Sequence, residues 1–515
     1  MNSSTPSPPS ASAPRWKRAL TRLFQIAITC ISLLVLGVTY IKWDSQRLAQ
    51  QIAQKVRLSD GGKGFRELAP PVVPETSNFC SIPCLKDSAG GTGSHDRDEI
   101  TRTRVQDFIR RLKVATDDVK ATDLAEKPEP TTALWAKRLT DRLPAPIRDN
   151  LPKQSSPSAT VIAATDALIP ELAEVLEAAN RPNAQWIPTL RIRKFKGPLQ
   201  FVETQQPTVS LGLAKLLNAL AIVYLEGNSP EKTADCLKSI IRIAEANLDE
   251  PLHISGLVAA SVLSSAQTSL KCALSNHKMS VSQIEGLLAC LQKIRVTESH
   301  ARASRVEVAI GLEFVDSLDL PQVRNALHDH ASNAYPALFA FSGALMKNLS
   351  LRALLEQVSP EAPMSSGEIP SHMRRIAEWQ NRKHSPLQDL AERLYPMQIP
   401  RLSLLRTMAT TEAQLRLSRL ACAIEIHRRS KSVLPLTLDE LPPAIVADND
   451  DPFATGPMHY RQLNPESQSG SFRLWSVGFD FTDENGEVEQ TRPSAPPRPS
   501  GGDIVWNSAL PTRNP

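Results

Sequence analysis

The sequence predicts a mainly α-helical protein with an N-terminal transmembrane helix, an exported array of helical hairpins and a small C-terminal α+β head with a short antiparallel sheet. Three observations predict this class. The run Leu23–Ile41 contains no charge, apolar residues recur at helical spacing through most of the chain, and short β-prone runs gather near the C-terminus. Because 515 residues exceed what one hydrophobic core usually supports, we expect two or three exported domains.

Composition and periodicity divide the chain into six segments. They are a disordered cytoplasmic tail (1–22), a transmembrane helix (23–41), a helix extension with a Pro/Gly-rich linker (42–95), a loosely packed helical region (96–207), a helical array (208–400) and the head (401–515). An aromatic content of 5% and 41 prolines favour helices with irregular connections over a β-rich protein.

The uncharged run Leu23–Ile41 makes a helix of about 28 Å, close to the roughly 30 Å hydrocarbon core of a bilayer. Four basic residues and no acid precede it (Arg15, Lys17, Arg18 and Arg22). Such an excess marks the cytoplasmic side, so the bulk of the chain is expected to be exported from the inner membrane. The alternative is a cleaved signal peptide, but Val38–Trp43 lacks the small residues of a cleavage site.

Charge and cysteines bound the possible partners and the compartment. The formal net charge of +5 falls to +1 without the four basic residues before the span, which gives no electrostatic case for nucleic acid. Six cysteines lie beyond the span, where an oxidising compartment permits disulfides. Cys80 and Cys84 are spaced to close a small ring, whereas three others fall at apolar helix positions and predict buried thiols: Cys236, Cys272 and Cys290.

The strongest helical pattern runs from Thr208 to Val296. An apolar helix stops at Gly227–Glu231, which supplies a turn, an N-cap and a first-turn proline for a second helix. The stretch Ala214–Glu245 resembles one unit of a tetratricopeptide repeat, without a convincing second copy. Pro251–Asn276 and Ser280–Arg295 predict another helix pair, the latter opened by a Ser280–Gln283 capping box.

No catalytic constellation stands out from the residues. Four side chains on the next helical stretch offer acids and a base, although their spacing fits a charged face: Glu298, His300, Glu307 and Glu313. His328 and His330, two residues apart, would point in different directions on a helix and suit one metal poorly. No adjacent nucleophile, base and orienting group is visible.

The C-terminal part carries short motifs in a definite order. A long helix (Leu402–Ser430) is followed by a loop, by Asp451-Pro-Phe within Asp451–Arg461, and by Ser-Val-Gly within Phe472–Asp480. This order resembles the globular head of the major pseudopilin of type II secretion, and Gly502–Trp506 resembles that family's closing strand. The resemblance covers Thr410 to Trp506 and implies one helix packed on a small sheet.

Residue patterns support the same layout independently. Three short β-prone runs, Met458–Arg461, Phe472–Val477 and Ile504–Trp506, predict a small antiparallel sheet that one helix can cover. Pseudopilins begin with a processed Gly-Phe-Thr-Leu-Ile-Glu segment, which does not precede the span here. We therefore expect a folding or docking module and not a filament subunit.

The loop Asp480–Gly486 groups hard oxygen donors around a glycine turn, which suits calcium. Pseudopilins hold calcium in the equivalent loop, and the resemblance implies four ligands: Asp480, Asp483, Asn485 and Asp503. The spacing does not match an EF-hand. An acidic turn without metal stays open as an alternative, because the proline-rich insertion Arg492–Gly501 departs from the family and could displace Asp503.

Together these features predict a membrane-anchored, non-enzymatic interaction or scaffold protein of a bacterial cell envelope. A protein partner would bind the helical array or the head, the latter within a secretion-type assembly. A secretion-system component proper is a further possibility. The competing hypothesis is an envelope hydrolase, which would require His300, His328 or His330 to cluster with carboxylates in a concave pocket.

Overall fold

The computed structural model describes residues 15–59, 71–89, 99–117, 119–186, 206–317, 351, 369, 371, 401–447, 449–463, 470–487 and 502–508. The chain forms two compact units. The first comprises Met1–Val56, Gly311–Val358 and His384–Pro396, and the second Arg57–Ile310, Ser359–Lys383 and Met397–Pro515. His328 and His330 lie outside the described residues.

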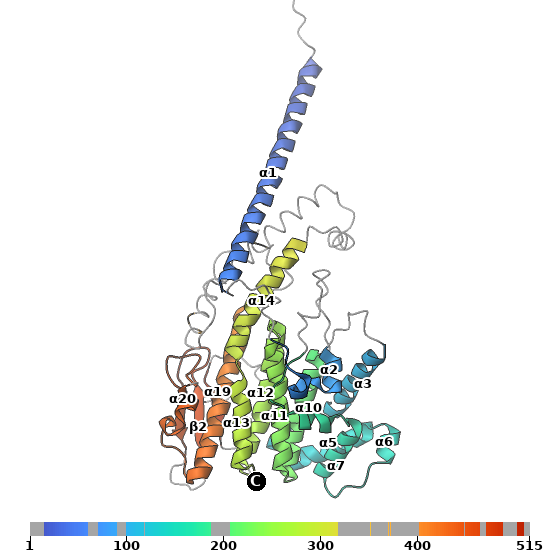
Figure 1. The fold of residues 1–515 in the computed structure, drawn as a ribbon, viewed down its shortest axis with the longest axis vertical. Helices are drawn as coiled ribbons and strands as arrows, with labels where there is room; N and C mark the ends of the chain where they lie inside the picture. The colour runs from blue at the N-terminus through green and yellow to red at the C-terminus, as the bar shows by residue number, and fades with distance from the viewer. Residues whose placement is uncertain are drawn as a thin grey trace, which may run out of the picture. The chain divides into compact units, whose positions relative to one another are not determined.

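Helix α1 (Arg15–Ser59) supplies the N-terminal part of the first unit and continues without a break past Ile41. Its 45 residues make a rod of about 68 Å, drawn in blue in Figure 1. Val35, Leu36, Tyr40 and Trp43 are exposed. Further along, one stripe at helical spacing is buried: Asp44, Ser45, Leu48 and Ile52. The rod therefore changes from an exposed apolar surface to a one-sided packed helix.

The second unit begins with short helices. They are η1 (Glu75–Ser77), η2 (Phe79–Ser81), α2 (Pro83–Ala89), α3 (Glu99–Thr116), α4 (Ala121–Glu126), α5 (Pro128–Arg142), α6 (Ala145–Asp149), α7 (Pro157–Leu168) and α8 (Leu172–Ala178). Buried polar groups tie the segment together. Asn78 donates to the Gln185 carbonyl at 2.8 Å and accepts from the Gln185 N–H at 2.8 Å, while the Trp135 indole donates to the Ala115 carbonyl at 3.1 Å. The segment packs on the long helices through α2–α5, α7 and α8.

Long helices form the centre of the second unit (Figure 1). They are α10 (Gln206–Glu226), α11 (Pro230–Asp249), α12 (His253–Ser275), α13 (Val281–Lys293), the part of α14 (Val296–Ser317) up to Ile310, and α19 (Arg401–Lys431). The turn between α10 and α11 contains Asn228 at φ 57°, a left-handed conformation that asparagine tolerates. The hairpin and the Ser280–Gln283 capping box predicted from the sequence are confirmed.

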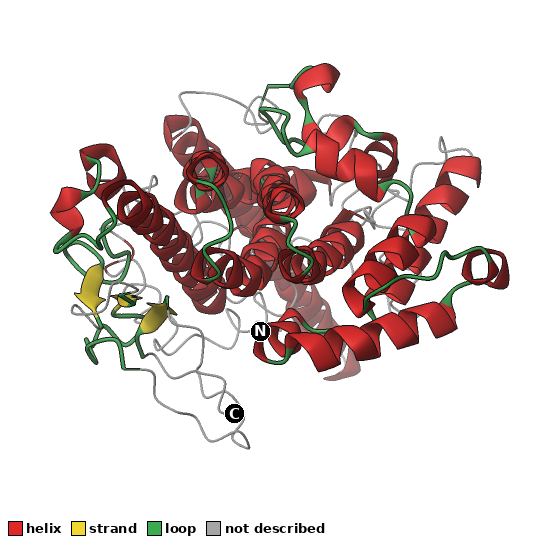
Figure 2. Ribbon diagram, turned by 90° about the horizontal axis from the view of Figure 1, so that it is seen from below, coloured by secondary structure: helices red, strands yellow, loops and turns green. Residues whose placement is uncertain are grey.

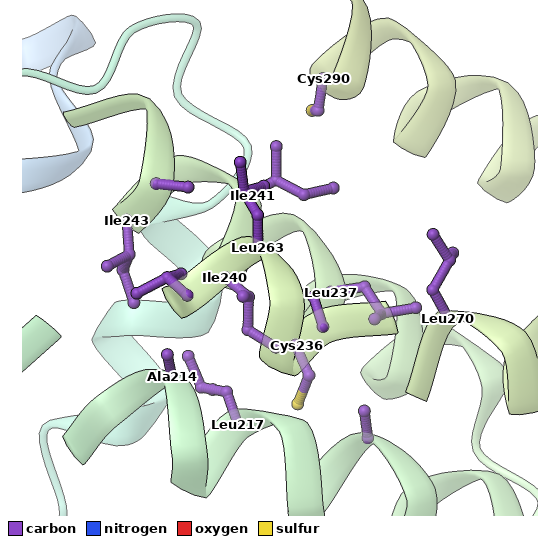
Figure 3. Packing of buried hydrophobic residues seen from close by; sticks show 14 of the residues in the cluster. Ala214, Leu217, Cys236, Leu237, Ile240, Ile241, Ile243, Leu263, Leu270 and Cys290 are labelled. Carbon is purple, nitrogen blue, oxygen red and sulfur yellow. The ribbon is translucent and has the colours of Figure 1, made fainter. Parts of the chain in front are cut away.

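The core lies where α10, α11 and α12 pack on one another. Figure 3 shows Ala214 and Leu217 of α10 facing Cys236 and Ile240 of α11. The predicted buried thiols are confirmed, since Cys236, Cys272 and Cys290 are buried and free; Cys80 and Cys84 are free as well. Burial raises the pKa of the Cys272 thiol to about 11, which keeps it protonated and unreactive near neutral pH.

Within the described residues, α10 and α12 are long and apolar enough to cross a membrane by composition. However, 78% of the most apolar stretch of α10 and 61% of that of α12 are buried inside the unit. Both are therefore core helices, because their apolar surface is already covered by α11 and by each other.

The C-terminal part contributes η4 (Leu438–Glu440), α20 (Pro443–Ala447) and three strands, β1 (His459–Gln462), β2 (Phe472–Ser476) and β3 (Ile504–Asn507). The strands form one antiparallel sheet in the order β1-β2-β3, with Leu474 opposite Tyr460 on one side and Trp506 on the other. The predicted small antiparallel sheet is confirmed. It lies beside the long helices in Figure 2, and α19 packs on β2 and β3.

Helix α19 also packs on α12 and α13, so it is shared between the sheet and the helical core. Its buried Arg419 donates to the carbonyls of Leu291 at 3.0 Å and Ile294 at 2.7 Å, which satisfies acceptors at the C-terminal end of α13. Ser418 bonds Gln267 of α12 at 2.9 Å. Removing this helix from the core would expose both apolar surface and unpaired carbonyls.

Candidate functional site

The loop that follows β2 contains the predicted calcium ligands. Two of its residues, Phe481 and Asn485, have φ of 60°, and Gly486 has φ of 72°. A Cβ at Gly486 would lie 2.7 Å from Arg473 Cδ and 3.0 Å from the Trp475 ring, so only glycine fits against β2 here. This close approach fixes the loop on the sheet.

The loop's own N–H groups occupy part of the predicted ligand set. Asp480 Oδ1 accepts from the Thr482 N–H at 3.0 Å. Asp483 Oδ1 accepts from the Trp475 indole at 2.9 Å and from the Asn485 N–H at 2.8 Å, and these bonds, against the opposing effect of burial, lower the pKa of Asp483. Each carboxylate makes these bonds through Oδ1 and not through Oδ2.

Asp503 lies at this loop, so the preceding insertion does not displace it. Asp503 Oδ2 accepts from the Gly486 N–H at 2.7 Å, and the Asp503 N–H donates to Glu484 Oε2 at 3.1 Å. Desolvation and the neighbouring Asp503 carboxyl raise the pKa of Glu484. Asp503 Oδ1 is buried and accepts no hydrogen bond from the described part of the chain. Sequence reasoning missed Glu484 as a candidate ligand, although it stands within the acidic loop.

Calcium coordination by the four predicted residues stays a prediction. Within the part of the chain described here, no group of three or more His, Cys, Asp or Glu side chains is arranged to hold a metal ion. The described contacts pair Asp503 with Glu484, while Asp480 bonds within the loop. Asp483 bonds both within the loop and to Trp475 of β2, and its Oδ2 lies 3.8 Å from His459 Nδ1.

A second cluster joins the start of α12 to α14. His253 Nδ1 lies 2.5 Å from Glu307 Oε2, and His253 Nε2 lies 3.0 Å from Ser304 Oγ. The His253 backbone N–H donates to Glu307 Oε1 at 2.7 Å. The ring of His300 packs against that of His253, with 5.1 Å between centroids. The cluster therefore contains a hydroxyl, an imidazole and a carboxylate connected in series.

Helical spacing places three members of this cluster on one face of α14, because His300, Ser304 and Glu307 are separated by four and three residues. His253 comes from a different helix. The sequence singled out His300 and Glu307, but it gave no signal for His253 or Ser304, since only the approach of α14 to the start of α12 brings them together. The side chains of His253 and Glu307 are each 14% exposed.

The other candidates from that stretch do not join the cluster. Glu298 is exposed, and its carboxylate lies 3.9 Å from Arg295 Nε. Only the backbone of Glu313 is described. His300 lies beside His253, which contacts a carboxylate, while His328 and His330 lie outside the described residues. The enzyme hypothesis stays a prediction.

A hollow of about 250 Å³ lies between the end of α12, α19 and the sheet. Its lining includes Ser275, His277, Glu425, Arg428, Phe472 and Trp506. Burial alone would raise the pKa of Glu425, but hydrogen bonds from Arg428, His277 and Arg429 outweigh it and lower the pKa to about 2. The hollow therefore has both a fixed carboxylate and aromatic side chains in its lining.

No protein-family model matches this sequence, and no curated protein or solved structure is significantly similar to it.

Proposed function

We propose that the protein is a single-pass, membrane-anchored interaction protein of a bacterial cell envelope, with its N-terminus in the cytoplasm and the bulk of the chain exported. The observation that carries this proposal is α1, one continuous helix that contains the uncharged run 23–41 directly after four basic residues. Tyr40 and Trp43, whose rings lie 6.0 Å apart, would lie at the membrane–water interface on the exported side of the inner membrane.

We further propose that the sheet, α19 and the acidic loop act as a pseudopilin-like docking module within a secretion-type assembly. A sheet covered by one helix, an Asp-Pro-Phe turn and a closing strand support this proposal. The long helices carry the module, because α19 packs on both the helical core and the sheet.

The acidic loop is the proposed calcium site of this module, with Asp480, Asp483, Asn485 and Asp503 as ligands. Asp503 Oδ1 supports the proposal, since a buried carboxylate oxygen without a hydrogen bond is costly unless a proton or a cation compensates it. Glu484 lies beside it and adds a fifth oxygen donor. Calcium prefers six to eight such oxygens, so water and carbonyl groups would complete the shell.

The anchor is tested by fractionation and topology. The full chain with a C-terminal tag should stay in the membrane fraction through alkaline carbonate washing. Protease added to cells should remove the tag once the outer membrane has been made permeable. As a control, a variant that begins after residue 41 should leave the membrane fraction. Release of the full chain by carbonate, or a tag protected from protease in opened cells, would contradict a single-pass anchor of this orientation.

Calcium binding is tested by calorimetry on the full chain in detergent, because α19 is built into the helical core. Saturable binding should occur and be lost in Asp503→Asn and Asp483→Asn, and calcium at about a hundred times Kd should raise the unfolding free energy by about 2.7 kcal/mol. Asp439→Asn is the matched control, an exposed aspartate in the same region. Absence of binding heat and of stabilisation would remove calcium from the proposal.

A second candidate function is an envelope hydrolase. The specific observation in its favour is the hydrogen-bonded series of Ser304, His253 and Glu307, because nucleophile, base and orienting group within reach of one another are the signature of covalent catalysis. The first proposal concerns where the chain lies and what it docks to. This one concerns chemistry at the start of α12, and the two can be tested separately.

A further inference from the structure

We propose that Ser304 is the nucleophile of a serine-type acyl-transfer site, with His253 as its general base and Glu307 as the residue that positions the imidazole. The proposal deepens the hydrolase function and rests on it. It assigns ester hydrolysis as the reaction, with a carboxylic ester as the substrate class.

The hydrogen bonds determine the direction of proton transfer. Glu307 Oε2 accepts from His253 Nδ1 at 2.5 Å, which fixes the tautomer in which Nε2 carries a lone pair. Ser304 Oγ lies 3.0 Å from that nitrogen, within the range for transfer of its proton. The hydroxyl also lies 3.0 Å from the His300 carbonyl, so it has two acceptors for one proton. Only transfer to His253 activates the oxygen.

A purely structural role accounts for part of this geometry. Glu307 Oε1 accepts the His253 N–H and thereby caps the first turn of α12, whose N-cap residue, Leu252, makes no side-chain capping bond. A cap, however, needs one carboxylate oxygen. It does not account for the second oxygen on Nδ1 or for a hydroxyl on Nε2. The same carboxylate therefore both anchors α12 and orients the imidazole.

The reaction balances with water as the only co-reactant. Ser304 Oγ bonds to the ester carbonyl carbon as its proton passes to His253 Nε2, and the C–O bond to the alcohol breaks as the alkoxide takes that proton. Water then attacks the acyl carbon and gives a proton to His253 Nε2. That proton passes to Ser304 Oγ as the bond between the acyl carbon and Oγ breaks, which releases the carboxylic acid and restores the Ser304 hydroxyl. Glu307 remains a carboxylate throughout and stabilises the imidazolium.

The surroundings favour an ester with an apolar part. Ile254, the residue after His253, is 53% exposed, so the first turn of α12 has accessible apolar surface. Ser304 itself is half-buried.

The test is covalent labelling of the detergent-solubilised full chain with a fluorophosphonate probe. Attack by Ser304 Oγ forms an O–P bond and releases fluoride, and peptide mass spectrometry locates the adduct. Labelling should occur at Ser304, disappear in Ser304→Ala, and slow about 10²-fold in His253→Gln. Glu307→Gln should slow it as well and change its pH profile, which a residue acting only as a cap would not do.

Two variants control for general effects on the fold. Ser265→Ala removes a half-buried serine of α12 that bonds a helix carbonyl, and His277→Gln removes a histidine that contacts Glu425 and Arg428. Both should leave labelling at Ser304 unchanged. A folded chain that is not labelled, or is labelled only at other serines, would overturn the proposal. Neither outcome would bear on the membrane anchor, which is measured without the probe.

Discussion

At the scale of single residues, Glu425 shows how a buried charge is kept. Its side chain is 4% exposed, yet Arg428 and Arg429 lie 2.7 Å and 2.6 Å from its Oε1. His277 is 3.1 Å from the same oxygen. These donors come from α19 itself and from the end of α12. They offset the desolvation free energy of the buried carboxylate, and through it they connect the two helices.

This junction predicts acid sensitivity. Because the folded-state pKa of Glu425 is about 2 and the ordinary value is 4.5, its contribution is full above about pH 5 and is lost as the pH falls toward 2. Glu425→Gln should lower the unfolding free energy at pH 7 by about 3 kcal/mol and flatten its dependence on pH below about 5. Denaturant titrations of the full chain at a series of pH values measure both effects.

The matched control is Glu298→Gln, which removes an exposed carboxylate that lies 3.9 Å from its arginine. Such a surface pair contributes little, so this variant should keep both the stability and the acid slope of the parent chain. Equal acid slopes in the parent chain and Glu425→Gln would show that other carboxylates control the acid response.

At the scale of elements, Asp451 explains why the Asp-Pro-Phe turn and the Ser-Val-Gly strand occur together. Its buried carboxylate accepts from the Ser476 hydroxyl at 2.7 Å, the Val477 N–H at 2.9 Å and the Phe453 N–H at 2.9 Å. One side chain therefore satisfies the turn that contains it and the end of β2, twenty-five residues later. The two motifs are parts of one contact.

Replacing this carboxylate should uncouple the turn from the strand. Asp451→Asn places an amide N–H₂ against donors, and the loss should be about 2 to 3 kcal/mol of unfolding free energy, measured by denaturant titration. Asp450→Asn, at the exposed neighbouring position, should change stability by less than about 0.5 kcal/mol. Similar losses in the two variants would mean that Asp451 acts only through local turn propensity.

At the scale of the whole molecule, three apolar helices have different surroundings. α10 and α12 are covered by other helices of the second unit, whereas Val35 and Leu36 of α1 are 56% and 65% exposed. An exposed apolar rod is unfavourable in water and favourable in lipid, and this contrast is the physical basis for proposing α1 as the membrane span.

Fractionation of the full and shortened chains identifies which apolar helix contacts lipid. If the chain without residues 1–41 still behaves as an integral membrane protein, α10 or α12 must leave the core and cross the bilayer. The burial of both helices predicts that it will not.

The sequence by itself determined the features that depend on neighbours along the chain. Apolar periodicity predicted the α10–α11 hairpin, Ser280 and Gln283 predicted a cap, and alternation with turn residues predicted the sheet. The acidic loop was also recognisable, because its donors lie close together in the chain. Each of these signals arises from local backbone geometry, which residue type and spacing control directly.

Only the tertiary structure decided which distant groups meet. His253 and Ser304 are separated by 51 residues, and Glu425 reaches His277 across 148. Such contacts follow from the packing of whole helices through many weak apolar contacts, and no short motif records them. The sequence therefore identified His300 and Glu307 as isolated candidates, and the approach of α14 to the start of α12 joined Glu307 to a base and a hydroxyl.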